Sequence, residues 1–228
     1  TEVSITTAAV LSGLGTALLG GFAGSILSEL FRTAFGIVPI APEIALPEDP
    51  GLLALTLLNY ALLPAFLEEM VFRGIVMQSL RRFGDTFALI ASATVFVLVH
   101  GNFSQSASTF VMGLLIGYFV MRTGSLWVGI AMHLANNLLV FGLRMMARAL
   151  PEQFGVLAHY LIYIVVMAAA LISVILVCRR HDGMFWVRGR EQPLSNGSKV
   201  VVLFGSLMML VFLAVISFVF FSNFRVAA

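Results

Sequence analysis

Seven long stretches of mostly apolar residues constrain this chain more than any other feature of its sequence. A helix needs about 20 such residues to cross the hydrocarbon core of a bilayer. Only 11% of the 228 residues are charged, whereas about 25% are charged in a typical soluble domain. We therefore predict an all-α, polytopic membrane helix bundle of about seven transmembrane helices (six to eight). The predicted spans are residues 8–28, 52–80, 86–103, 107–121, 125–147, 155–178 and 200–221.

The distribution of basic residues predicts how this bundle is oriented. Lys and Arg gather on the cytoplasmic side of membrane proteins. The connections after spans two, four and six carry eight basic residues, and the opposite side carries four. The N-terminus is thus expected in the cytoplasm. We treat residues 1–228 as a single transmembrane domain, with a core at roughly 52–147 and a basic cytoplasmic loop at 179–199. The net charge of +2, with its arginines scattered between apolar spans, argues against a nucleic-acid surface.

Several polar side chains lie inside these spans, where ionisable groups are costly and are functional candidates by default. Span two carries two acids and a basic residue, span three a histidine, and span five a histidine and two amides: Glu68, Glu69, Arg73, His100, His133, Asn136 and Asn137. At about 1.5 Å per residue, Glu68, His100 and Asn137 each lie roughly 20 Å from the cytoplasmic end of their span, and His133 lies roughly 14 Å from it. Three helices therefore place polar groups in one layer of the bilayer.

Helical spacing groups these residues further. Glu69 and Arg73 are four apart with the acid first, which favours an ion pair on one helix face. Arg73 is five residues from Glu68 and is close enough to approach that carboxylate as well. Pro64 lies four residues before Glu68 and is expected to kink the span, because proline removes a helical hydrogen bond.

The same spacing argument applies to the two histidines. His133 and Asn137 are four apart and share one face of their helix, so both are expected to point into one cavity. Phe96 precedes His100 by four residues and is expected to pack against its ring. Each residue alone has an ordinary structural explanation, but their joint occurrence at one depth favours a functional site.

Small residues predict how closely the helices approach. Gly20 with Gly24, and Gly113 with Gly117, form small-xxx-small pairs that let helix backbones pack tightly. We interpret both pairs as features of a compact bundle. His159 is interpreted in the same way, as a structural residue.

A buried carboxylate beside an imidazole is a general acid–base pair, and an imidazole with a carboxamide can donate hydrogen bonds to an oxyanion. Together these groups suit amide hydrolysis by an activated water. Other intramembrane protease signatures are missing: the three aspartates fall in predicted loops, and neither an H-E-x-x-H nor a G-x-S-x-G motif occurs. A serine–histidine pair such as Ser104 with His133 remains open.

Three motifs carry a resemblance to a known family. Residues 68–73 read E-E-x-x-x-R, residues 96–100 read F-x-x-x-H, and residues 133–137 read H-x-x-x-N. In this order they resemble the CAAX protease and bacteriocin-processing family (CPBP, or Abi), which includes the type II CAAX prenyl endopeptidases. The resemblance covers roughly residues 60–140.

The resemblance implies a glutamic intramembrane protease with a role for each motif residue. Glu68 would activate the hydrolytic water with help from His100, and the oxyanion would be stabilised by His133 and Asn137. Glu69 and Arg73 would orient and tune Glu68. This mechanism needs no cofactor. The implied partners are the lipid bilayer and a membrane-anchored protein or peptide substrate, and the expected location is a bacterial cytoplasmic membrane.

Three alternatives remain open at this point. Glu68, His100 and His133 would also suit a three-ligand zinc site with one open position. The chain could instead be a non-enzymatic bacteriocin-immunity factor or scaffold, in which the polar layer binds a partner. Buried Glu and His residues also form proton relays, although the chain shows no inverted repeats of the kind common in transporters. Substrate identity and oligomeric state are left open by the sequence.

Overall fold

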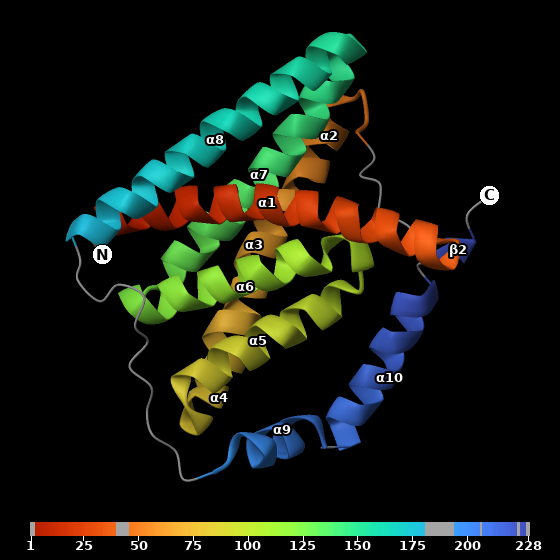
Figure 1. Cartoon of the computed structure of the whole chain (residues 1–228). Coiled ribbons are helices and arrows are strands. Elements are labelled where there is room, and N and C mark those ends of the chain that lie inside the picture. The colour runs from red at the N-terminus through yellow and green to blue at the C-terminus, as the bar shows by residue number, and fades with distance from the viewer. Residues whose placement is uncertain (1–2, 40–45, 181–193, 206, 223, 227–228) are drawn as a thin grey trace.

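The structure, a computed structural model, describes residues 3–39, 46–180, 194–205, 207–222 and 224–226. The described part is built almost entirely of helices (Figure 1). In chain order they are α1 (Val3–Phe35), α2 (Pro50–Leu57), α3 (Leu63–Glu69), α4 (Met77–Leu80), α5 (Asp85–His100), α6 (Phe103–Thr123), α7 (Leu126–Ala149), α8 (Glu152–Arg180), α9 (Asn196–Phe204) and α10 (Leu207–Ser222). Two π-helical segments, η1 (Leu58–Leu62) and η2 (Met70–Val76), join α2, α3 and α4, and a 3₁₀ turn, η3 (Arg81–Phe83), follows α4.

Five helical segments are long and apolar enough to cross a membrane: Ile5–Phe35, Pro50–Phe83, Gln105–Thr123, Leu126–Ala149 and Glu152–Leu176. They confirm the predicted all-α polytopic bundle. The predicted third span is the apolar helix α5, which has only 16 residues. It stops at His100 because Gly101 adopts a left-handed conformation, with φ 57°, that ends the helix.

The predicted seventh span is not one straight helix. It consists of the segments Gly197–Phe204 and Met209–Val219, which are bent by 76° relative to each other. Counting this pair as one span brings the total in the described residues to six. Of the predicted basic loop at 179–199, residues 181–193 lie outside the described part of the chain.

A short strand, β1 (Ile37–Pro39), follows α1 and pairs antiparallel with β2 (Phe224–Val226) near the C-terminus. Helix α2 then begins at Pro50. The carboxylate of Asp49 caps it by accepting a hydrogen bond of 2.8 Å from the backbone N–H of Leu52.

Helix α1 lies across the bundle and packs on α6, α7 and α8 (Figure 1). Three of the four predicted glycines, Gly20, Gly113 and Gly117, make close contacts with neighbouring helices. A Cβ added to Gly20 would lie 2.4 Å from the Cα atom of Ser108 on α6. On the other side of α6, a Cβ on Gly113 would lie 3.3 Å from the Cα of Ala93 on α5. Close backbone approach on both sides fixes α6 between α1 and α5.

Replacing Gly20 with valine is expected to destabilise the bundle, because the new side chain meets backbone that cannot rotate away. Overpacking of this kind costs about 1–3 kcal/mol. Thermal unfolding of the purified protein in detergent measures the loss. Gly21→Ala is the matched control: a Cβ there would meet only the Tyr163 hydroxyl, at 3.9 Å. An equal melting temperature for wild type and Gly20→Val would contradict the α1–α6 contact.

Candidate active site

The second membrane segment changes its helical pitch on both sides of the paired acids. The π-helical segment η1 ends at Leu62, α3 follows from Leu63 with Pro64 as its second residue, and η2 begins directly after Glu69. π-Helical turns, whose backbone hydrogen bonds run from residue i to residue i+5, occur frequently at functional sites. The wider turn rotates the side chains that follow it relative to a regular α-helix. Glu68 and Glu69 thus lie in a short α-helical stretch between two irregular ones.

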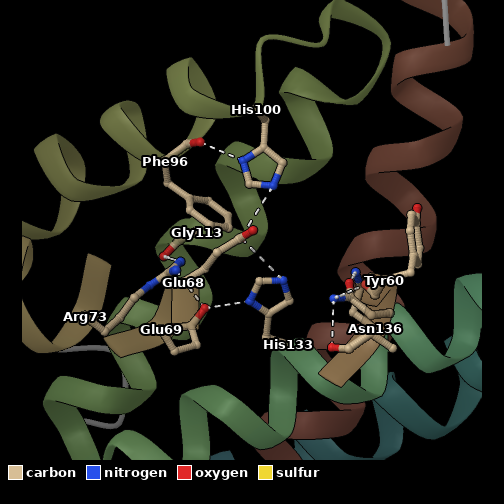
Figure 2. A network of polar contacts seen from close by, with 11 residues as sticks. Tyr60, Glu68, Glu69, Arg73, Phe96, His100, Gly113, His133 and Asn136 are labelled. Carbon is tan, nitrogen blue, oxygen red and sulfur yellow. Dashed lines mark hydrogen bonds and ion pairs between the residues drawn. The ribbon is translucent and has the colours of Figure 1, made fainter. Parts of the chain in front are cut away.

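Glu68 lies between the two histidines that the sequence singled out (Figure 2). Its Oε2 atom is 3.7 Å from Nε2 of His100 on α5 and 3.9 Å from Nε2 of His133 on α7. Both distances are too long for a direct hydrogen bond, and Oε2 is buried without a hydrogen-bond partner in the described residues. The Glu68 side chain as a whole is 32% exposed, and it lines a cavity. The cavity leaves room for a small polar molecule to donate a hydrogen bond to this oxygen.

Glu69 connects the same site to a buried arginine. Its Oε1 atom accepts hydrogen bonds of 2.8 Å from Nη1 of Arg73 and 2.8 Å from Nδ1 of His133. The side chains of Glu69 and Arg73 are 0% and 1% exposed, which confirms the predicted ion pair and places it deep in the protein. Arg73 also donates from Nη2 to the carbonyl of Gly113 on α6, at 3.2 Å. One pair therefore ties three membrane segments together.

Phe96 packs beneath these polar groups. Its ring lies 4.5 Å from that of His100 and 5.9 Å from that of His133, both edge to face, and the guanidinium of Arg73 lies 4.4 Å from its centroid. The predicted contact between Phe96 and His100 is confirmed. The Phe96 carbonyl also lies 2.8 Å from His100 Nδ1, so this nitrogen carries the proton and Nε2 faces Glu68.

The Asn137 side chain is held by main-chain carbonyls of the second segment. Its Nδ2 lies 3.4 Å from the carbonyl of Tyr60 and 3.5 Å from that of Ala61, and Asn136 donates to its Oδ1 at 3.2 Å. Pro64 explains why the Tyr60 carbonyl is free to accept, because a proline has no N–H to donate to the carbonyl four residues earlier. The missing donor of Pro64 thus leaves a carbonyl for Asn137, and these long bonds hold its amide loosely.

A cavity of about 640 Å³ joins all four predicted catalytic residues. It is bounded by α1, η1, α3, α5, α6, α7 and α8. Beyond the predicted residues its polar lining includes Asn59, Tyr60, Asn102, Gln105, Ser108, Thr109, Asn136, Arg144, His159 and Tyr163. The volume is sufficient for a short peptide segment and falls in the range of ligand pockets, about 300–1,000 Å³.

Hydrogen-bond partners assign the charges around His133. A carboxylate only accepts, so the Nδ1 of His133 donates to Glu69, and its Nε2 is a donor only when the ring is protonated.

Arg73 was expected to approach Glu68 as well as Glu69. It hydrogen-bonds to Glu69 and to the Gly113 carbonyl, and it interacts electrostatically with both Glu69 and Glu68. The contact between Glu69 and His133 was not anticipated, because it joins residues 64 positions apart. Arg144 and His159 were also missed as cavity residues. Arg144 could have been found, because it lies seven positions, or two helical turns, after Asn137.

Two alternatives from the sequence were a zinc site and a Ser104–His133 pair. Among the described residues, no group of three or more His, Cys, Asp or Glu side chains is arranged to hold a metal ion. The side chain of Ser104 is not among those described, so the Ser104–His133 pair stays a hypothesis.

Comparison with known proteins locates a family match on the same part of the chain. Residues 50–139 match the model of the family described as type II CAAX prenyl endopeptidase Rce1-like. The matched segment contains all three motifs and runs from α2 into α7. No curated protein and no solved structure matches the chain. The match confirms the resemblance seen in the sequence and supports an intramembrane protease in general terms.

Proposed function

We propose that this chain, whose residues 50–139 match the Rce1-like CAAX protease family model, is an intramembrane endopeptidase that uses Glu68 to activate water. The substrate would be a membrane-associated protein or peptide, cut near its C-terminus or near its membrane anchor. The observation that carries the proposal is the position of Glu68 Oε2, which is buried without a hydrogen-bond partner in the described residues and lies within 4 Å of two imidazoles in a peptide-sized cavity.

In the first step Glu68 takes a proton from a water held between its Oε2 and His100 Nε2. The resulting hydroxide adds to the carbonyl carbon of the scissile peptide bond. General-base assistance of this kind contributes about 10²–10⁴ to a rate. His100 is suited to hold the water, because its Nδ1–H is fixed on the Phe96 carbonyl and its Nε2 points toward Glu68.

In the second step the tetrahedral intermediate carries a negative charge on the former carbonyl oxygen. The protonated His133 donates to this oxyanion from Nε2, and the loosely held amide of Asn137 turns to donate as well. One oxyanion donor contributes about 10²–10³ to kcat. The proton taken by Glu68 passes to the amide nitrogen as the C–N bond breaks, which releases an amine and a carboxylic acid.

The experiment is cleavage of lipid-anchored peptides by purified protein, read as two product masses. His100→Ala is expected to lower turnover by at least 100-fold, with little change in peptide binding. If the chain is an immunity factor or scaffold, alanine changes at the cavity alter association and no product appears with any variant. A proton-coupled transporter would instead give Glu68-dependent flux into liposomes.

Chelation separates the glutamic mechanism from a zinc mechanism on the same residues. We expect turnover to be unchanged after incubation with a strong chelator and gel filtration, because the proposed steps use only side chains and water. A zinc enzyme would lose activity and regain it when zinc is added back. Metal analysis of the active fraction provides the control.

The orientation in the membrane is part of the proposal. The basic residues favour a cytoplasmic N-terminus, and the family resemblance suggests a bacterial cytoplasmic membrane. Cys178 is the only cysteine, so single cysteines placed at each end of a Cys178→Ser chain can be labelled in intact cells with a membrane-impermeant reagent.

A further inference from the structure

A second charged group lines the cavity at a distance from Glu68. Arg144 lies on α7, eleven residues beyond His133 and seven beyond Asn137, and all three line the same cavity. Among the described residues Arg144 has no hydrogen-bond or ion-pair partner. Among the residues that the structure describes, Glu68 is the only acid that lines the cavity. The cavity thus holds a carboxylate at one place and an unpaired guanidinium at another.

The neighbouring basic residue shows what a structural arginine looks like on the same helix. Arg148 lies one turn further along α7 and is fully used: it pairs with Glu48 at 3.3 Å and donates to the carbonyls of Leu46 and Pro47. It therefore holds the segment that leads into α2. Arg144 faces the cavity instead and is left for a ligand.

We infer that Arg144 binds the terminal carboxylate of the substrate peptide and so sets where the chain is cut, an inference that rests on the proposed function. An arginine recognises a carboxylate through two parallel hydrogen bonds. Repulsion from Glu68 would push a free carboxylate away from the water-activating end, toward Arg144. Tyr60 lines the cavity with it and interacts electrostatically with Arg144, so its hydroxyl group is available to the same end of the peptide.

The spacing on α7 gives the length of the released fragment. Arg144 is about 10 Å from Asn137 and about 16 Å from His133 along the helix axis, at 1.5 Å per residue. An extended peptide covers about 3.3–3.6 Å per residue. A scissile carbonyl held between His133 and Asn137, with its C-terminus on Arg144, therefore leaves about three to five residues in the released fragment.

Two versions of one peptide test the subsite directly. The probe is a fluorescent peptide with an S-farnesyl cysteine followed by three aliphatic residues, made as the free acid and as the C-terminal amide. In maltoside micelles, which carry no phosphate, we expect wild type to favour the acid by about 10- to 100-fold in kcat/KM. Arg144→Gln should remove this preference mainly by raising KM for the acid, and Arg144→Lys should restore part of it.

The control variant is Arg148→Gln, which is expected to keep the preference. Binding of both peptides to a Glu68→Gln protein provides a readout that needs no turnover. If that protein binds the acid more tightly through Arg144 but wild type makes no product, the subsite stands and the protease proposal fails. Equal binding of acid and amide, or an equal loss for both in Arg144→Gln, overturns the inference. A preference restored only by adding anionic lipid would assign Arg144 to a headgroup and overturn it as well.

Discussion

Glu68→Gln is expected to abolish turnover, with a fall of about 10²–10⁴ in kcat. Glutamine has the same shape but cannot take a proton from water, so the cavity keeps its form while the reaction loses its base. The Glu68 side chain makes no hydrogen bond through Oε2 in the described residues, so little structure depends on its charge. We therefore expect an unchanged melting temperature and unchanged peptide affinity. Single-turnover cleavage and binding by fluorescence anisotropy measure the two effects separately.

Glu152→Gln is the matched control for this variant. Glu152 lies in the exposed first turn of α8, outside the cavity lining, so the same chemical change there should leave turnover as in wild type. Cleavage by Glu68→Gln at the wild-type rate would remove the base from the mechanism and with it the proposed reaction.

Breaking the Glu69–Arg73 pair is expected to have the largest effect on stability. Glu69→Leu leaves a guanidinium that is 1% exposed without its carboxylate, and removing one partner of a buried pair costs about 3–5 kcal/mol. The double variant Glu69→Leu/Arg73→Met replaces both charges with apolar groups of similar size. It should recover most of the stability, because such replacements are often neutral. Thermal unfolding of the two variants in detergent tests this order.

The double variant is expected to remain inactive even when it is stable. Nδ1 of His133 would lose the carboxylate that holds the ring in place, so Nε2 would no longer be positioned to donate to the oxyanion. Recovery of wild-type kcat by the double variant would show that the pair is only a structural tie. If the single variant unfolds at the wild-type temperature, the burial of the pair is not what holds these three segments together.

Much of this site was predictable because it depends on short-range spacing. The pairs Glu69–Arg73 and Phe96–His100 are four residues apart, and a helix brings such residues together whatever the rest of the fold does. The π-helical segments were not predictable, because no residue type in Leu58–Leu62 or Met70–Val76 demands them; only Pro64 marked where the helix is irregular.

The sequence by itself determined that the chain is a membrane helix bundle, since lipid leaves few other solutions for so apolar a polypeptide. It also predicted that acids, imidazoles and an amide belong to one site. Only the tertiary structure decided which groups touch. His133 contacts Glu69 as well as Glu68. The contact with Glu69 depends on how far α3 and α7 are rotated about their axes. The tertiary structure also placed Arg144, which has no hydrogen-bond or ion-pair partner among the described residues, in the cavity lining. Helix rotation is fixed by packing, such as that of Gly20 on Ser108, between residues far apart in the chain.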